Sequence, residues 1–311
     1  PETLSLLSIT YFTAALALRL GIPRFYALFG SALFLAHPVA TEAVNSVGFL
    51  EDILALFFMQ ISLFCLLGEQ RATLRRIFAA AACYGMALLS KEVSIFFPVA
   101  AWVILRKDGW GAQALRRLGF AMGSVLILFV VLRFVIFHPP FEPVFTEVGA
   151  MPDWETLFTM ATVAANYIRL FFVPIGLSAS HVVPPHPILT WNVILSFVVL
   201  AGFTTLIWRS SSFAVRWGGL WCLLFFLPVS QIIPIAQISA ERFMYVPLFG
   251  ASLALASAWD TQFSFSNIRN KWISCGLVLI LSILTLQRNT VWRTHDGLFL
   301  DALRKNPRNV T

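Results

Sequence analysis

Charged residues are scarce in this chain. Only 12% of its 311 residues are Asp, Glu, Lys or Arg, about half the share found in an ordinary soluble domain. Hydrophobic residues make up 59% of the sequence, and the mean hydropathy is +0.81. This composition excludes a soluble globular domain and predicts an all-α polytopic membrane protein.

Cysteine is also rare, and the basic residues form no single large patch. The four cysteines, Cys65, Cys83, Cys222 and Cys275, lie within apolar runs without metal-ligand spacing or an obvious disulfide partner, so we expect them to pack in the core. The net charge of +7 comes from short basic clusters between apolar runs. Such clusters are typical of topology signals and of contact with anionic lipid, and they do not indicate a nucleic-acid partner.

Ten apolar segments approach the length of a membrane span. A membrane helix needs about 20 apolar residues, and fewer when its ends snorkel. The predicted spans are residues 3–20, 25–45, 50–67, 77–90, 93–105, 118–137, 190–208, 217–234, 243–259 and 272–287. The short spans 77–90 and 93–105 meet at Ser90-Lys91-Glu92 and are also compatible with one bent helix.

Basic residues occupy every second connection between these spans. They are Arg19 and Arg24, then Arg71, Arg75 and Arg76, then Arg106, Lys107, Arg116 and Arg117, then Arg209 and Arg216, and finally Arg269 and Lys271. The positive-inside rule makes these connections cytoplasmic. The opposite connections, which are poor in Lys and Arg, are then extracytoplasmic, on the periplasmic or lumenal side of a bacterial inner membrane or the endoplasmic reticulum.

Residues 154–174 stand between two extracytoplasmic connections and therefore cannot cross the membrane fully. Their mixed polarity predicts an amphipathic helix that is interfacial or re-entrant. Arg169 would lie at headgroup depth on this helix. It is either a snorkelling arginine or a phosphate ligand, since a guanidinium matches phosphate oxygens bidentately.

The final residues lose the membrane character. Leu298, Leu300 and Leu303, followed by Asn306-Pro307, predict a short soluble helix ended by proline. One helix cannot bury its own apolar face, so a helical repeat region is expected to follow. Because the sequence starts at Pro1 and stops in mid-pattern, we expect a fragment of a longer protein.

Residues 35–52, LAHPVATEAVNSVGFLED, gather ionisable groups at the junction of two spans, where they point to function. Structural roles account for several of them equally well: a helix dipole for Glu51-Asp52, and a helix end for His37-Pro38. The adjacent opposite charges Lys91-Glu92 and Glu241-Arg242 could be ordinary interfacial ion pairs, and Tyr245 an interfacial anchor. Their shared place on one membrane face favours the functional interpretation.

Four blocks, in order, resemble the transmembrane and tetratricopeptide-repeat-containing O-mannosyltransferases and their bacterial relatives, which have the GT-C glycosyltransferase fold. They are HPVATEAVNSVGFLEDILALFF (37–58), LLSKEVSIFFP (88–98), ANYIRLFFVPIGLSASHVVP (165–184) and LPVSQIIPIAQISAERFMYVPLFG (227–250). The chain departs from the family where GFLED lacks an arginine, so that either Glu51 or Asp52 matches the family acid. It departs again at Gln231, where many relatives have asparagine.

The resemblance implies a GT-C-like bundle of about ten membrane helices over residues 1–287 and the start of a soluble tetratricopeptide-like region over 288–311. It implies transfer of mannose or a similar hexose from a polyprenyl- or dolichyl-phosphate donor to an acceptor, expected to be protein Ser/Thr bound by the repeats. No cofactor is implied beyond this lipid-phosphate sugar, and a divalent metal has no ligand pattern to support it. The family's catalytic base lies in a loop after the first membrane helix, which we expect upstream of Pro1.

The resemblance also suggests which residues bind the donor. The candidates for its phosphate are Arg169, Arg242, Lys91 and Arg133. The candidates for substrate binding or support are His37, Glu42, Glu51, Asp52, Glu92, Glu241 and Tyr245. Among them, the carboxylates could bind sugar hydroxyls or hold the basic residues, and His37 could bond the phosphate or the acceptor. Two other classes remain open: an inactive membrane scaffold that presents a repeat domain, and a transporter. A transporter is less favoured because its ionisable residues would lie near the midplane, often within an internal repeat.

Overall fold

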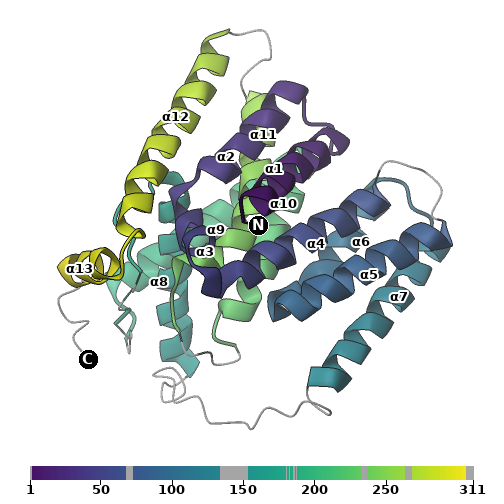
Figure 1. The fold of residues 1–311 in the computed structure, drawn as a ribbon, viewed down its shortest axis with the longest axis horizontal. Helices are drawn as coiled ribbons and strands as arrows, with labels where there is room; N and C mark the ends of the chain where they lie inside the picture. Colours follow the sequence, from purple (N-terminus) through teal and green to yellow (C-terminus); the bar gives the residue numbers. More distant parts are fainter. Residues whose placement is uncertain are drawn as a thin grey trace.

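Helices form all the regular structure in the described part of the computed structural model (Figure 1). The structure describes residues 2–67, 73–133, 153–179, 188–232, 237–262 and 268–305, together with positions 181, 183, 184, 186 and 235. The α-helices are α1 (Glu2–Arg19), α2 (Arg24–Ala36), α3 (Thr41–Asn45), α4 (Leu50–Leu66), α5 (Leu74–Ser90), α6 (Phe97–Lys107), α7 (Ala112–Val131), α8 (Asp153–Phe172), α9 (Trp191–Arg209), α10 (Phe213–Phe226), α11 (Tyr245–Gln262), α12 (Ile268–Val291) and α13 (His295–Lys305).

The prediction of an all-α integral membrane protein is confirmed. Among the described residues, four helical segments are long and apolar enough to cross a membrane: Val47–Leu66, Ala112–Val131, Trp191–Arg209 and Ile268–Val291. A fifth is added if α2 and the segment Pro38–Asn45, which meet at a 47° bend, count as one span. Each of the ten predicted spans contains a helix, but these criteria do not establish ten crossings.

Short helices explain the difference. The eleven residues of α6 extend about 16 Å, roughly half the thickness of a bilayer core. The chain leaves α5 at Lys91, which is extended at φ −155°, and makes a 3-10 turn, η3 (Glu92–Phe96), before α6 begins. Residues 77–105 therefore form two helices separated by a turn. The predicted span 118–137 ends beyond α7, and its residues 134–137 lie outside the described part.

The core forms where α10 and α11 pack closely together, with α2 against α11. Gly250 is needed at this crossing, since a Cβ there would lie 2.7 Å from the carbonyl oxygen of Gly218. Small residues allow such close approach of membrane helices. Trp217 and Trp221 fill the space beside the crossing and donate from Nε1 to the carbonyls of Ala100 and Val246, both at 2.9 Å. The buried indoles thereby fix α10 against both α6 and α11.

Two predicted helices outside the bundle core are also present. The predicted amphipathic segment 154–174 forms α8, which packs against α9 and leaves Trp154 and Leu157 exposed. Its depth in the membrane stays a prediction. The predicted soluble helix is α13, and it contacts α12 (Figure 1, yellow). Helix α12 continues to Val291, four residues beyond the expected domain boundary at 287.

Candidate functional site

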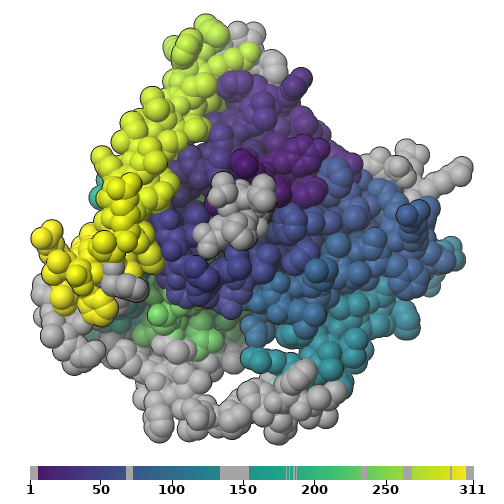
Figure 2. Space-filling model, viewed as in Figure 1, coloured from purple at the N-terminus to yellow at the C-terminus, as the bar shows by residue number. Residues whose placement is uncertain are grey.

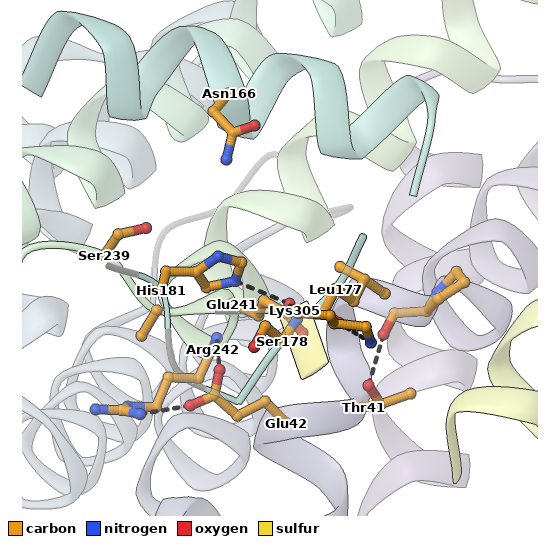
Figure 3. Close-up of polar contacts among 12 residues, drawn as sticks. Thr41, Glu42, Asn166, Leu177, Ser178, His181, Ser239, Glu241, Arg242 and Lys305 are labelled. Atoms are coloured by element: carbon orange, nitrogen blue, oxygen red, sulfur yellow. Dashed lines mark hydrogen bonds and ion pairs between the residues drawn. The ribbon is translucent and has the colours of Figure 1, made fainter. Parts of the chain in front are cut away.

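Buried polar side chains gather where the bend after α2, helix α3, the 3-10 turn η7 (Glu241–Met244) and the end of α12 meet. His37 ends α2 in an extended conformation, and Pro38 opens a short turn that leads into α3. Figure 3 shows Glu42, Glu241 and Arg242 facing one another across this junction, with Asn166 of α8 pointing toward them. We call this group of side chains the polar cluster.

Glu42 and Arg242 are joined directly. The Glu42 carboxylate accepts from Nη1 of Arg242 at 2.5 Å and from the backbone N–H of Arg242 at 3.0 Å. The Glu42 side chain is 2% exposed. The guanidinium also donates to Gln237 and lies 4.0 Å from the centroid of the Phe49 ring. Arg242 is therefore neutralised by Glu42 and held in place by Gln237 and Phe49.

A second ion pair lies at the start of α4. Lys91 places its Nζ 2.5 Å from Asp52 Oδ2 and 3.2 Å from Glu51 Oε1. Asp52 is 4% exposed whereas Glu51 is 49% exposed, so Asp52 is the inward-facing acid of the two. Glu92 turns the other way and contacts Arg133 at 3.2 Å.

The interpretation of adjacent charges as sequence-neighbour pairs is therefore wrong. Lys91 pairs with acids of α4 and Arg242 with an acid of α3. In each case an extended residue, Lys91 itself or Ala240, precedes the 3-10 turn. Neighbouring side chains then point in different directions, and each charge finds a partner on another helix.

Glu241 is fully buried and is the centre of a third set of charged contacts, after those of Glu42 and Lys91. Its Oε1 accepts from the backbone N–H of Ser178 and lies 3.0 Å from Nε2 of His181. Its Oε2 lies 3.9 Å from Nη2 of Arg288, which is 6% exposed. Neither Oε2 nor the Arg288 Nη2 has a hydrogen bond within the described residues. This buried ion pair therefore retains unused hydrogen-bonding capacity.

Arg288 links the polar cluster to α13. Its Nη1 donates to Asp301 at 2.6 Å, and Lys305 contacts both Asp301 oxygens at 2.7 Å and the Leu177 carbonyl at 2.6 Å. Burial alone would raise the pKa of Asp301, but hydrogen bonds from Lys305 and Arg288 lower it below its usual range. Helix α13 is thus held to α12 and to the segment after α8 by charged side chains.

His37 is committed to internal contacts. Its Nδ1 accepts from the backbone N–H of Val39 at 3.3 Å, so its Nε2 carries the proton and donates to the Phe171 carbonyl at 2.9 Å. The ring is 1% exposed and stacks on the Phe171 ring. His37 therefore fastens the bend after α2 to the end of α8 and has no ring nitrogen left for a ligand.

Tyr245 is fully buried and does not lie at a surface as an interfacial anchor would. Its hydroxyl has no hydrogen-bond partner among the described residues. The side chain lines a cavity of about 160 Å³ together with His37, Thr41, Thr285 and Asn289. The other lining residues, Leu6, Phe34, Leu35, Ala40 and Val44, make most of the wall of this small cavity apolar.

Arg169 differs from the other predicted cations. It is exposed near the end of α8, where it donates from Nε to Asn166 Oδ1 at 2.9 Å and from Nη1 to the Ile175 carbonyl at 3.3 Å. No carboxylate contacts it in the described part of the chain. Two residues earlier, Tyr167 donates to the Ala240 carbonyl and accepts from the Ala240 N–H. Burial raises the pKa of Tyr167 to about 12, so it remains a neutral phenol that ties α8 to η7.

The structure thus brings Glu42, Glu241 and Arg242 together, and it pairs Lys91 with Asp52 and Glu51 at the start of α4. Phe49, which precedes α4, contacts Arg242 and so connects the two groups. Sequence reasoning missed three side chains that extend the polar cluster from Glu241, namely His181, Arg288 and Asp301. Arg288 carried a signal, since it follows an apolar run on the side that is otherwise poor in basic residues. Within the described residues, no group of three or more His, Cys, Asp or Glu side chains could hold a metal ion.

The composition and fold define an all-α integral membrane protein with a buried polar cluster at the junction of its helices. Part of the chain is similar to the protein O-mannosyl-transferases TMTC3 of Mus musculus (32% identical over 88 residues) and Homo sapiens (33% over 89), and to Tmtc3 of Drosophila melanogaster (34% over 95). These matches cover 27% to 29% of this chain and span only a tenth of each relative. No family model matches the chain, and no solved structure is significantly similar to it.

Proposed function

We propose that this chain is part of a membrane glycosyltransferase that transfers mannose or a similar hexose from a polyprenyl- or dolichyl-phosphate donor to protein Ser/Thr. The similarity to proteins named O-mannosyl-transferases supports the reaction class. The observation that carries the proposal is Arg169, a cation without a carboxylate partner in the described structure, on a helix that Tyr167 ties to the junction held by the buried pair Glu42–Arg242. Charges inside a membrane protein are costly to bury and mark functional sites.

The proposed reaction requires a base and a cation from the protein. A base takes the proton of the acceptor hydroxyl as its oxygen attacks the anomeric carbon, and the lipid phosphate leaves with its negative charge. A cation near that phosphate stabilises the leaving group, and its effect is larger where water is excluded. We assign no base among the described residues, in keeping with the resemblance, which places the base upstream of Pro1.

Arg169 is the candidate for the phosphate. Arg242 and Lys91 are neutralised by carboxylates, and we assign them to holding α3 against η7 and α4 against η3. Arg169 has no acidic partner in the described structure, and Asn166 orients its guanidinium through Nε. Nη2 makes no described contact, and a guanidinium with free N–H groups suits a phosphate monoanion or dianion.

The proposed topology puts the polar cluster on the periplasmic or lumenal face, with ten crossings and α8 in the interface. The basic connections at the opposite helix ends support this orientation. It predicts that a cysteine at the exposed Val47 is labelled by an impermeant reagent from outside, and one at the exposed Asp108 only from the cytoplasmic side. Labelling of Val47→Cys from the cytoplasm would reject the orientation.

Activity is tested in membranes that carry the full-length protein, with radiolabelled polyprenyl-phosphate mannose and protein acceptor. We expect transfer by the wild type, a higher KM for the donor in Arg169→Gln, and no change in the control Arg24→Gln. Arg24 is a suitable control because it is an exposed arginine at the start of α2, among the predicted cytoplasmic residues. No transfer by the wild type would reject the enzyme and favour an inactive scaffold that presents a repeat domain.

A further inference from the structure

A groove that the proposed reaction does not use lies between α5 and α7. Figure 2 shows the blue and teal surface of these two helices at one edge of the molecule. Its volume is about 880 Å³, within the range of small-molecule sites. It follows α5 from Leu74 to Ala82 and α7 from Gln113 to Val125, whereas Lys91 and its ion pairs lie beyond the end of α5. The groove and the polar cluster are therefore separate.

The helical repeat explains the shape of the groove. The α7 residues Arg116, Arg117 and Phe120 follow one another at spacings that place them on a single helix face. Phe78 and Ala82 of α5 face them across the gap. Toward the middle of the two helices, α5 and α7 approach each other closely, since a Cβ at Gly85 would lie 3.3 Å from Val125 Cγ1. The groove is consequently narrow toward the middle of the helices and open at their starts.

Charge is concentrated at the open end. Arg116 and Arg117 are both exposed, and in the described structure neither forms an ion pair or hydrogen bond through its side chain. No acidic residue lines the groove. Both helices also begin at this end, so their positive dipole ends add to the field of the arginines. The open end is thus complementary to an anion, while Phe78, Ala82 and Phe120 offer apolar walls.

We propose that this groove binds one anionic glycerophospholipid. Its phosphate contacts Arg116 and Arg117, and one acyl chain lies along Phe78, Ala82 and Phe120. Basic pockets between membrane helices recognise acidic headgroups in this way, and each basic residue near a headgroup strengthens binding by several-fold. The proposal is independent of the glycosyltransferase assignment, because it uses none of the same residues.

The test compares the full-length protein in two kinds of nanodisc. One contains phosphatidylcholine mixed with phosphatidylglycerol, and the other contains phosphatidylcholine alone. Retained lipid is measured by native mass spectrometry after release. We expect one phosphatidylglycerol to be retained by the wild type, about tenfold less by Arg116→Gln/Arg117→Gln, and wild-type retention by Arg24→Gln/Lys107→Gln. The control pair removes the same charge from exposed positions on the same predicted face.

A second variant tests the apolar part. Ala82→Trp fills the groove while leaving both arginines in place, and it should reduce retention because the acyl chain loses its space. Ala82 is exposed, so the larger side chain is accommodated without repacking the core. The proposal is rejected if phosphatidylcholine is retained as well as phosphatidylglycerol, or if the two double variants lose lipid equally. Unchanged retention in Ala82→Trp would reject the acyl-chain placement.

Discussion

Glu42 and Arg242 are 200 positions apart in the sequence, yet the Glu42 carboxylate accepts two hydrogen bonds from Arg242, at 2.5 and 3.0 Å. One bond comes from the guanidinium and the other from the backbone N–H, so Glu42 fixes both the side chain and the turn that carries it. Helix α3 and the turn η7 lie in contact, and this pair joins them directly. The polar cluster is organised around it.

The first prediction concerns this pair. Glu42→Gln leaves the Arg242 guanidinium without its carboxylate, and Arg242→Gln leaves the buried Glu42 carboxylate without its cation. Each change should therefore destabilise the protein by about 3 kcal/mol. The double variant should lose clearly less than the sum, since no charge is then left unpaired. Thermal unfolding in detergent measures all three. Additive losses would show that the two side chains do not depend on each other.

A second prediction separates the two adjacent acids of α4. Asp52→Asn should cost about 3 kcal/mol, because Asp52 is 4% exposed and leaves Lys91 without its closest partner. Glu51→Gln should change stability by less than about 0.5 kcal/mol, since Glu51 is 49% exposed and water already screens its contact with Lys91. The same unfolding assay compares them. Equal effects would contradict the assignment of Asp52 as the buried partner.

The sequence predicted the positions of the helices and of the helix junction, but it did not predict which charged side chains form ion pairs at that junction. Hydrophobic runs depend on neighbouring residues, so α4, α7 and α12 could be placed from composition alone. The pairing of Arg242 with Glu42 depends on how distant helices pack, which no local pattern contains. For the same reason the adjacent charges at 241 and 242 suggested a pair that the fold separates, and the long-range contact of Arg288 with Glu241 went unseen.

For His37, the sequence indicated the correct position in the fold but suggested a different role. Its position before Pro38 correctly indicated a helix end, and its chemistry suggested a ligand for phosphate or acceptor. The fold instead uses both ring nitrogens for backbone contacts with Val39 and Phe171. A polar residue in an apolar chain can thus be required by unsatisfied backbone groups near a bend, and sequence alone does not distinguish this from a binding role.

The third prediction is a pH dependence of α13. The pKa of Asp301 is lower in the folded state than the ordinary value near 4, so its contribution is fully present above about pH 4 and is lost as pH falls through the folded value. We expect α13 to stay docked between pH 5 and 8 and to detach under more acidic conditions. Hydrogen exchange of residues 295–305, corrected for intrinsic rates, measures docking.

Variants of α13 provide the controls. Asp301→Asn should expose the helix at neutral pH, because a neutral amide replaces the carboxylate that pairs with both Arg288 and Lys305. Asp296→Asn removes an exposed acid from the same helix and should leave exchange unchanged. Equal protection in the two variants would mean that apolar contacts, and not Asp301, hold α13.

The fourth prediction tests how Arg169 is positioned. Asn166→Leu keeps a similar side-chain volume but removes the oxygen that accepts from Arg169 Nε at 2.9 Å. A hydrogen bond to a charged group is worth roughly a tenfold change in affinity, so the KM for the lipid-phosphate donor should rise about tenfold with kcat nearly unchanged. Asn166→Gln, which retains a neutral amide oxygen as acceptor, should restore most of the wild-type KM. A purely structural role would instead lower kcat and thermal stability together in Asn166→Leu, and Asn166→Gln would then not rescue donor binding selectively.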